Sequence, residues 1–296
     1  MNINFTDCPR VKSRAYNGAN GKKIAVEYGG EVYMLKFPAV PNRKYFTELS
    51  YTNSCISEYI GCHIFESVGF NAQKTLLGTF NVNGKEKIVC ACKDFTDKDT
   101  VFFDFCSIKN TVIDSETGGT GTELSEIIEA IEYQDRTDAY KLKQFYFDMF
   151  IVDALLGNFD RHNGNFGFLC NRDTNEYKIA PIYDCGSCLY PRVSENLMSE
   201  ILRNENEINS RIYNFPLSMI KVNDKKINYH EFINSLNNED CNAALARILP
   251  KIDIGKINEM INAAPFIFDI QKEFYTTMIK ARYDKILFPA YEKLKS

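Results

Sequence analysis

The chain has 296 residues, of which 45% are hydrophobic and 25% are charged. This composition is ordinary for globular proteins and excludes a disordered, collagen-like or coiled-coil chain, while the length favours two folding units. The 35 basic and 39 acidic residues give a net charge of -4, which lacks the strong basic excess of nucleic-acid-binding proteins, so we predict no nucleic-acid partner.

The sequence also lacks targeting signals. No apolar run reaches the roughly 18 residues that a membrane-spanning helix requires. The N-terminal residues do not show the basic and then apolar pattern of a secretory signal. The 10 cysteines are too sparse for a disulfide scaffold and favour a reducing compartment. The sequence therefore predicts a cytoplasmic protein without a membrane span, and it leaves the oligomeric state open.

The first hundred residues are predicted to be rich in β-structure. The first two strands flank Gly29-Gly30-Glu31, which is a hairpin signal. Gly69 provides a stop for the helix that follows. In chain order we expect strands at 23–28 and 32–37, a helix at 54–68, and strands at 74–80 and 87–92.

The remainder is predicted to be mainly helical. The Gly/Thr-rich segment 114–123 indicates a flexible surface loop, and the helix at 140–156 is apolar almost all round, which is typical of a central buried helix. We expect helices at 124–133 and 140–156, strands at 166–170 and 176–182, and helices from 194 onward, clearest at 252–261 and 270–294.

The change in texture near residues 92–95 divides the chain. We predict a β-rich N-lobe at residues 1–95 and a helical C-lobe at residues 96–296. A cleft between two such units is a natural place for a small ligand.

A polar turn at Asp160-Arg161-His162-Asn163-Gly164-Asn165 lies between the buried helix and an apolar strand. Asp184 follows the next strand directly. Carboxylate and carboxamide oxygens suit Mg²⁺, so Asn165 and Asp184 are candidate metal ligands, and Asp160 is placed to face a substrate hydroxyl. An Asx-rich turn with capping duties is the structural alternative. The second Asp after the hairpin favours a functional site.

This layout is that of kinase catalytic machinery. The order Asp160-Arg161-His162 occurs in phosphoinositide 3-/4-kinases and in HipA-like Ser/Thr kinases. The strings LGNFDRHNGN (156–165) and APIYD (180–184) resemble the HipA-like kinases. DCGSCLYP (184–191) further resembles a short branch of that family with a proinflammatory, cell-translocating member. The resemblance covers nearly the whole chain, although Cys185 stands where protein kinases usually have Phe.

The resemblance implies a bilobal, protein-kinase-like α+β fold with a β-rich N-lobe and a helical C-lobe. It implies a bacterial enzyme that uses ATP and Mg²⁺ to phosphorylate Ser or Thr hydroxyls of a protein substrate and that autophosphorylates. Asp160 would act on the hydroxyl proton, and His162 would support the loop geometry. Asn165 and Asp184 would hold Mg²⁺. The short branch also adds export into host cells as an alternative location.

A glycine-rich segment precedes the first strand of the hairpin. Alone it predicts a plain turn, and it is not a Walker A motif because no helix follows. Together with the catalytic turn, it is interpreted as the cover over the ATP phosphates. Its residues are Asn17, Gly18, Ala19, Asn20, Gly21 and Lys22.

Lys36 is a charge inside an apolar strand, and Glu58 interrupts an apolar stripe of the following helix. Kinases grip the nucleotide phosphates with a strand lysine that a helix glutamate holds. The alternatives are a solvent-facing edge strand for Lys36 and a partly solvated helix face for Glu58. We predict that the two side chains pair. Adenine is expected to bind the backbone near Cys92, Lys93, Asp94 and Phe95.

Cys185 and Cys188 form a C-x-x-C pair, and Cys90 and Cys92 alternate within one strand. A four-thiolate zinc site is conceivable, but such cysteines are more often local packing residues, which is our interpretation.

Two other functions remain as alternatives. A lipid kinase shares the Asp-Arg-His order, but residues 185–209 hold two arginines against four glutamates, which disfavours an anionic headgroup. A catalytically silent nucleotide-binding module is disfavoured because the candidate catalytic and metal positions are all present.

Overall fold

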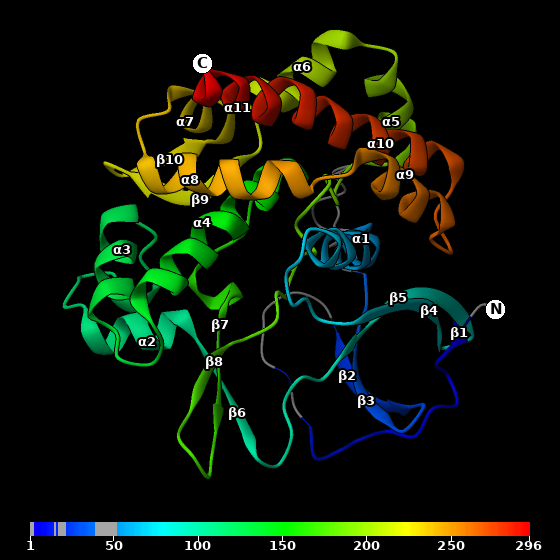
Figure 1. Cartoon of the computed structure of the whole chain (residues 1–296). Helices are drawn as coiled ribbons and strands as arrows, with labels where there is room; N and C mark the ends of the chain where they lie inside the picture. The colour runs from blue at the N-terminus through cyan, green and yellow to red at the C-terminus, as the bar shows by residue number, and fades with distance from the viewer. Residues whose placement is uncertain (1–2, 15, 17–21, 39–51) are drawn as a thin grey trace.

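The computed structural model describes residues 3–14, 16, 22–38 and 52–296. The first part of the chain forms a five-stranded sheet of order β1-β4-β5-β3-β2, with one helix, α1, packed on it (Figure 1). Only the β1–β4 pairing is parallel. The bounds are β1 Ile3–Asn4, β2 Lys23–Tyr28, β3 Glu31–Lys36, α1 Ser54–Ser67, β4 Thr75–Val82 and β5 Lys85–Lys93.

Two tight turns set the register of this sheet. Gly29 and Gly30 join β2 to β3 with φ angles of +60° and +78°. Asn83 and Gly84 join β4 to β5 with φ angles of +53° and +79°. Two consecutive residues in the left-handed region suit the twist of a hairpin, and Gly and Asn adopt that region most easily. The four expected strands and their order are confirmed, with boundaries that differ by at most two residues.

Strand β5 divides the apolar residues between two cores. Val89 and Ala91 belong to a small cluster on the outer face of the sheet. Cys90 and Cys92 face the other side and join the main core. Successive side chains of a strand point to opposite faces, so the two cysteines share a face, as the sequence predicted.

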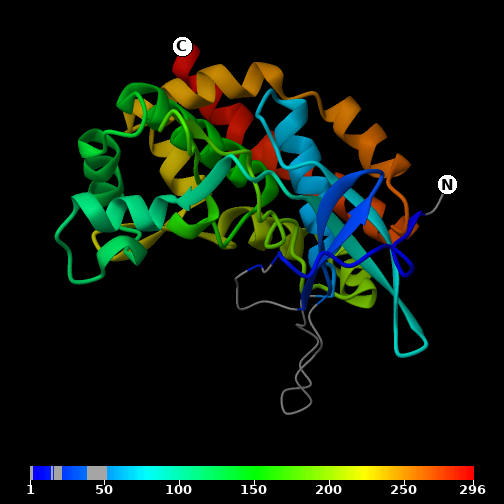
Figure 2. The same ribbon diagram turned by 90° about the horizontal axis from the view of Figure 1, so that it is seen from below.

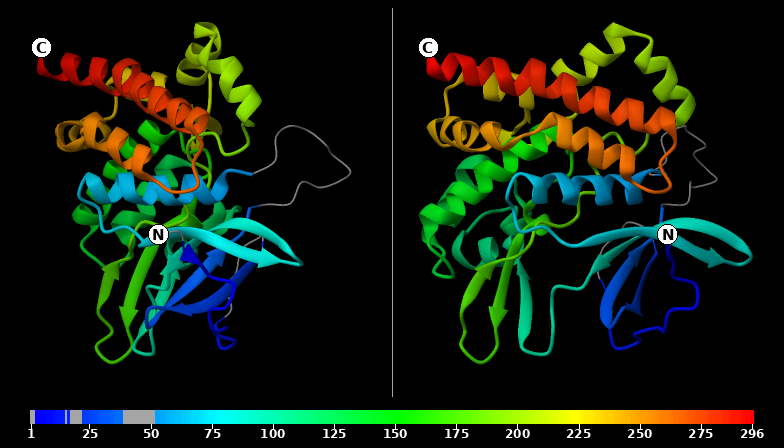
Figure 3. Two further views of the ribbon diagram at one scale, coloured as in Figure 1. Left: turned by 90° about the vertical axis from the view of Figure 1, so that its right-hand side faces the viewer. Right: turned by 45° about the vertical axis from the view of Figure 1, so that its right-hand side comes forward.

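Helix α1 lies between the first sheet and the C-terminal helices (Figure 3). Its two apolar faces are both buried in the main core, one represented by Ile60 and the other by Phe65. The chain leaves the helix through Gly69, whose φ angle is +98°. This two-sided burial is the reason that a charged side chain on α1 requires a partner inside the protein.

The second part of the chain is built around α4, whose C-terminal half is buried on all sides. A three-stranded antiparallel sheet of order β6-β7-β8 lies beside it (Figure 1). Gly157 ends α4 in the left-handed region, with φ of +61°, and turns the chain toward the polar turn. The bounds are β6 Thr100–Asp104, α2 Phe105–Val112, α3 Leu124–Tyr133, α4 Ala139–Leu156, β7 Gly167–Asn171 and β8 Tyr177–Ile179.

The C-terminal third covers α4 and α1 with helices, as Figures 2 and 3 show. Helices α10 and α11 continue each other through a π-helical turn at Tyr283–Leu287. None of the described helices is long and apolar enough to cross a membrane. The bounds are α5 Glu195–Leu202, α6 Glu205–Tyr213, β9 Leu217–Val222, β10 Lys225–Asn228, α7 Tyr229–Ser235, α8 Glu239–Ile248, α9 Ile254–Ala263, α10 Asp269–Arg282 and α11 Phe288–Lys295.

Three expectations need correction. The region after residue 194 is not purely helical, because β9 and β10 form a hairpin whose turn residues Asn223 and Asp224 have φ of +52° and +62°. Strand β6 was not expected at all. Segment 114–123, expected to be a flexible surface loop, contains a short 3-10 helix at Gly118–Thr120 in which Gly119 is buried.

Candidate active site

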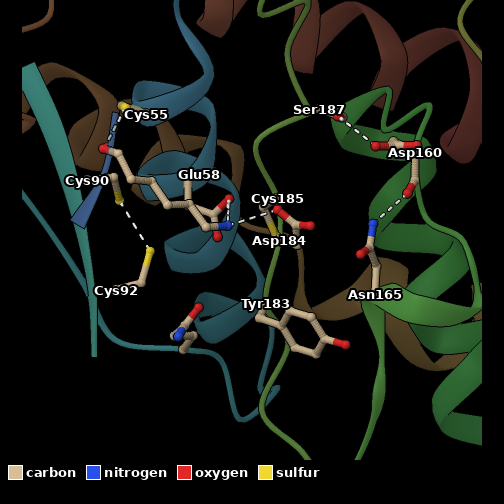
Figure 4. Close-up of polar contacts among 12 residues, drawn as sticks. Cys55, Glu58, Cys90, Cys92, Asp160, Asn165, Tyr183, Asp184, Cys185 and Ser187 are labelled. Carbon is tan, nitrogen blue, oxygen red and sulfur yellow. Dashed lines mark hydrogen bonds and ion pairs between the residues drawn. The ribbon is translucent and has the colours of Figure 1, made fainter. Parts of the chain in front are cut away.

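Lys36, at the end of β3, lies between two carboxylates from distant parts of the chain (Figure 4). Its Nζ is 2.9 Å from Glu58 Oε2 on α1 and 2.8 Å from Asp184 Oδ1, which follows β8. The structure therefore brings together three of the residues selected from the sequence. One ammonium group joins the first sheet, its helix and the second part of the protein.

The pKa values of the two carboxylates shift in opposite directions, although Lys36 acts to lower both. Glu58 is 0% exposed, and burial raises its pKa to about 7 although Lys36 opposes the shift. The side chain of Asp184 is 45% exposed, and Lys36 lowers its pKa to about 2. The Asp184 carboxylate is therefore ionised at neutral pH. Glu58 supports Lys36 from inside the core.

Asp184 has an unusual backbone conformation. Its φ is +55°, in the left-handed region that side chains other than Gly rarely adopt. Such a conformation costs on the order of 1 kcal/mol and persists where the surroundings enforce it. Here, Ile182 pairs with Ala72 in a parallel bridge just before Asp184. The strain thus accompanies a carboxylate held toward Lys36.

The polar turn 160–165 is held by its own side chains. Asn165 Nδ2 donates to the Asp160 carbonyl at 2.7 Å, and the amide oxygen then lies on the side of Asp184 (Figure 4). His162 Nδ1 accepts a hydrogen bond from the Gly164 N–H at 3.0 Å. His162 therefore supports the geometry of the turn.

The side chain of Asp160 is half-buried at the edge of the turn. Burial raises its pKa, and the neighbouring charge of Asp184 acts in the same direction. Ser187 Oγ lies 3.5 Å from Asp160 Oδ2. A carboxylate with an elevated pKa beside a hydroxyl is suited to accept a hydroxyl proton.

Arg161 attaches the polar turn to α4. Its Nε and Nη2 bind Asp153 on α4 at 2.9 and 3.3 Å, and Nη2 also reaches Cys185 Sγ at 3.6 Å. Its Nη1 donates to the carbonyls of Asn165 and Tyr183 at 2.8 and 2.7 Å. All five N–H donors of the guanidinium are thus used. We did not assign Arg161 or Asp153 from the sequence, although a carboxylate inside an apolar helix was the available signal.

Asn163 attaches the turn to segment 114–123. Its Nδ2 donates to the carbonyls of Gly119 and Gly121 at 2.7 and 2.7 Å. Behind these glycines, the buried Lys109 donates to the Gly118 carbonyl at 3.0 Å and to Glu126 at 2.6 Å. This is the physical reason that the segment is fixed to the protein.

The linker after β5 was expected to bind adenine through its backbone. Cys92 is buried in β5, and the N–H groups of Lys93 and Asp94 already donate to backbone carbonyls at 2.8 and 2.8 Å. The Lys93 carbonyl accepts from Gln73 Nε2 at 2.9 Å. The backbone groups that remain for the expected contact with adenine run from the Asp94 carbonyl to Phe95.

An aromatic cluster that we did not predict lies next to this linker. The ring of Tyr183 is 5.8 Å from Phe95 and 5.4 Å from Phe102, and the latter two are 5.7 Å apart. All three side chains are partly exposed. They present an apolar surface at the junction of the linker, β6 and the chain that leads to Asp184.

Of the expected glycine-rich cover, only Lys22 lies among the described residues. Lys22 is described and exposed, and its Nζ lies 5.7 Å from the ring centre of Phe37. The residues Asn17, Gly18, Ala19, Asn20 and Gly21 lie outside the described residues.

The cysteines near the site pack in separate groups. The Sγ atoms of Cys90 and Cys92 are 3.8 Å apart on the sheet side of α1, and Cys55 Sγ donates to the Lys36 carbonyl at 3.3 Å. Cys185 instead contacts Arg161. Within the described part of the chain, no three His, Cys, Asp or Glu side chains are arranged to hold a metal ion. A magnesium site of one carboxylate and one carboxamide, completed by phosphate oxygens, needs no such cluster.

Comparison with known proteins identifies relatives. Residues 15–252 match the HipA-like C-terminal domain. The chain is 49% identical over 292 residues to the serine/threonine-protein kinase CtkA of Helicobacter pylori, covering 98% of this chain and 88% of that protein. The crystal structure of a Helicobacter pylori proinflammatory kinase CtkA matches with a TM-score of 0.93 at 48% identity, covering 100% of this chain and 98% of that chain.

A more distant likeness concerns the fold alone. HipA of Shewanella oneidensis, solved with HipB and its operator DNA, matches with a TM-score of 0.56 at 17% identity. The alignment covers 97% of this chain and 68% of that chain.

Proposed function

The chain belongs to the HipA-like family and is a serine/threonine protein kinase, and on this premise we propose that ATP and Mg²⁺ serve the site around Lys36, Asp160 and Asp184. The observation that carries the proposal is the Lys36 ammonium between Glu58 and Asp184, at 2.9 and 2.8 Å. A cation held in this way is available to bind anionic phosphates. We also propose that the lobes divide at residues 95 and 96, since β6 already belongs to the second sheet.

Asn165 and Asp184 have the chemistry that Mg²⁺ requires. Asp184 stays ionised, with a pKa lowered to about 2, and its side chain is 45% exposed. The Asn165 amide is oriented by its hydrogen bond to Asp160, which leaves its oxygen on the side of Asp184 (Figure 4). When bound, Mg²⁺ would neutralise charge on the phosphates. Two protein ligands plus phosphate oxygens match its preference.

The remaining side chains then have distinct roles. Lys36 binds the phosphates, and Glu58 positions Lys36 from the core. Asp160 orients the acceptor hydroxyl and accepts its proton, while His162 holds the turn. Catalysis of this kind depends on alignment and charge neutralisation rather than on a covalent intermediate.

The aromatic cluster beside the linker offers a surface for the nucleotide base. We propose that adenine lies against Phe95, Phe102 and Tyr183 and bonds to the backbone between Asp94 and Phe95. The glycine-rich residues 17–22 would cover the phosphates. Aromatic and apolar walls with a few backbone groups are usual for such ligands.

The acceptor is proposed to be a neutral hydroxyl flanked by basic residues. Segment 185–209 carries two arginines and four glutamates, and Glu195, Glu200 and Glu205 are exposed. An anionic lipid headgroup would be repelled there, whereas a basic peptide would not. We also propose that the enzyme phosphorylates itself.

Asp160→Asn tests the assignment directly. With radiolabelled ATP, and with both a basic protein and the enzyme itself as acceptors, we expect transfer to fall by about 10²- to 10⁴-fold. MgATP binding should persist because Asp160 lies away from Lys36. Asp173→Asn, on the exposed turn between β7 and β8, is the matched control. Near-normal turnover of Asp160→Asn would refute the role of Asp160.

A further inference from the structure

Tyr183 is hydrogen-bonded to the polar turn 160–165 through both its side chain and its backbone. Its hydroxyl donates to the carbonyl of Gly164, in the polar turn, at 2.6 Å. Its backbone carbonyl accepts from Arg161 Nη1, in the same turn, at 2.7 Å. The residue that directly precedes Asp184 is therefore bound twice to the turn that carries Asp160.

The ring of Tyr183 has little freedom to move. It packs at 5.4 Å and 90° against Phe102 and at 5.8 Å against Phe95. Aromatic contacts of this type add to the burial of the ring and restrict its orientation. The hydroxyl consequently donates to Gly164 from a ring whose position is fixed. Figure 4 shows this ring below Asp184 and Asn165.

The proposed reaction requires Asp160 and Asp184 to be held at a fixed separation. Lys36 holds Asp184 toward the first sheet, at 2.8 Å, but does not contact Asp160. Phosphoryl transfer requires the hydroxyl-binding carboxylate and the phosphate-side ligands to keep a fixed separation. Resting on the proposed function, we propose that Tyr183 is a positioning residue whose hydroxyl clasps the catalytic turn to the chain that carries Asp184.

A clasp of this kind differs from an ordinary stabilising hydrogen bond. Loss of a typical hydrogen bond costs about 1 kcal/mol of stability wherever it lies. A small displacement of the turn, by contrast, reduces the rate far more than the stability, because a misplacement of about 1 Å can cost 10²-fold. The two roles are thus separated by comparing turnover with stability.

Tyr183→Phe is the appropriate variant because it keeps the ring contacts and removes only the hydroxyl. We expect kcat for protein phosphorylation to fall about tenfold, with the KM for MgATP unchanged. Ile279→Val, in the fully buried part of α10, is the control. It should cost about 0.5–1.5 kcal/mol of stability, similar to the lost hydrogen bond, and leave kcat unchanged.

Hydrogen exchange supplies a readout that does not depend on activity. The Asn165 N–H donates to the His162 carbonyl at 2.9 Å and reports on the closed turn. In Tyr183→Phe, the amides of Gly164 and Asn165 should exchange faster, while Ile279→Val should leave them unchanged.

The outcomes separate the two proposals. Unchanged exchange of the turn, or a kcat that falls equally in Ile279→Val, would overturn the clasp, as would faster exchange with normal kcat. A wild-type protein that transfers no phosphate would refute the proposed function instead. The exchange comparison would then decide alone whether Tyr183 holds the turn.

Discussion

Two buried charge networks lie side by side in this protein, and they differ in how completely their polar atoms are satisfied. Arg161 and Asp153 form a closed network, in which every guanidinium N–H has an acceptor and both Asp153 oxygens accept hydrogen bonds. Lys36 and Glu58 form an open one. The Lys36 ammonium is shared between Glu58 Oε2 and Asp184 Oδ1, at 2.9 and 2.8 Å, and Glu58 Oε1 has no hydrogen-bond donor among the described residues.

This difference distinguishes a network that supports the structure from a network that can bind a ligand. A closed network beneath the catalytic turn fixes backbone carbonyls of Asn165 and Tyr183 and has no capacity for a ligand. The open network pairs one cation with two carboxylates, one of them 45% exposed, and can exchange partners. Incomplete satisfaction of buried polar atoms is therefore informative about function.

Neutralising Asp153 should give the largest effect. Asp153→Asn leaves Arg161 as a buried cation without its partner, which typically costs about 3–5 kcal/mol. We expect the melting temperature to fall by roughly 10 °C. Glu58→Gln is the matched isosteric change in the open network and should shift the melting temperature far less. Equal losses in the two variants would remove the distinction between the networks.

The second-largest effect should come from removing the Asp184 carboxylate, and it should appear in ligand binding. In Asp184→Ala, we expect the affinity for MgATP to fall about 100-fold, which is about 2.7 kcal/mol. A site of one carboxylate and one carboxamide cannot lose the carboxylate. Calorimetric titration with ATP in the presence and absence of Mg²⁺ would measure this, with Asp173→Ala as the control. Unchanged MgATP affinity would exclude Asp184 as a metal ligand.

The pH dependence of stability should distinguish Glu58 from Asp184. Burial raises the pKa of Glu58 from 4.5 to about 7, so between these values the folded protein holds a proton that the unfolded chain has released. The stability that Glu58 contributes is therefore present below pH 4.5 and is lost as the pH rises through 7. Asp184 acts oppositely, since its contribution is lost only as the pH falls toward 2.

Denaturant unfolding of the metal-free protein would test this. Glu58→Gln cannot titrate, so it should resemble the wild type at about pH 5 and be the more stable protein at about pH 8. If the free energy of unfolding changed with pH in the same way for both proteins between about pH 5 and 8, Glu58 would not titrate as expected.

Zinc removal should have the smallest effect, namely none. Cys90 and Cys92 pack against each other, whereas Cys185 contacts Arg161, and no three His, Cys, Asp or Glu side chains of the described residues are arranged to hold a metal ion. A zinc-specific chelator should leave the melting temperature unchanged. Stoichiometric zinc in elemental analysis, together with a chelator-dependent drop, would contradict this and add a third network to the comparison.

The open network was the part that sequence reasoning could predict. Lys36 in an apolar strand and Glu58 on an apolar helix are each anomalous, and two anomalies of opposite charge indicate a pair. The resemblance of the strings around Asp160 and Asp184 to HipA-like kinases supplied the remainder. The roles assigned to these residues stay predictions until the variants are measured.

The closed network and several elements could not be predicted in the same way. Arg161 lies in a turn already rich in polar residues, so nothing marked it as the partner of Asp153. Strand β9 alternates, with Ser218 and Ile220 buried, but its turn uses Asn223 and Asp224 without a glycine. The partner of Asp153 and the β9–β10 hairpin are thus determined by tertiary contacts, which local sequence patterns do not reveal.

Segment 114–123 has a practical consequence for anyone who engineers this protein. Its glycine and threonine content suggests a permissive place for an affinity tag or a reporter insertion. Gly119 and Gly121, however, have no room for a Cβ, because Cys106 and Thr117 occupy that space. An insertion there would pull on Asn163 and hence on the catalytic turn. The exposed turn at Asn83-Gly84, where Gly84 has open space beside it, is the better choice.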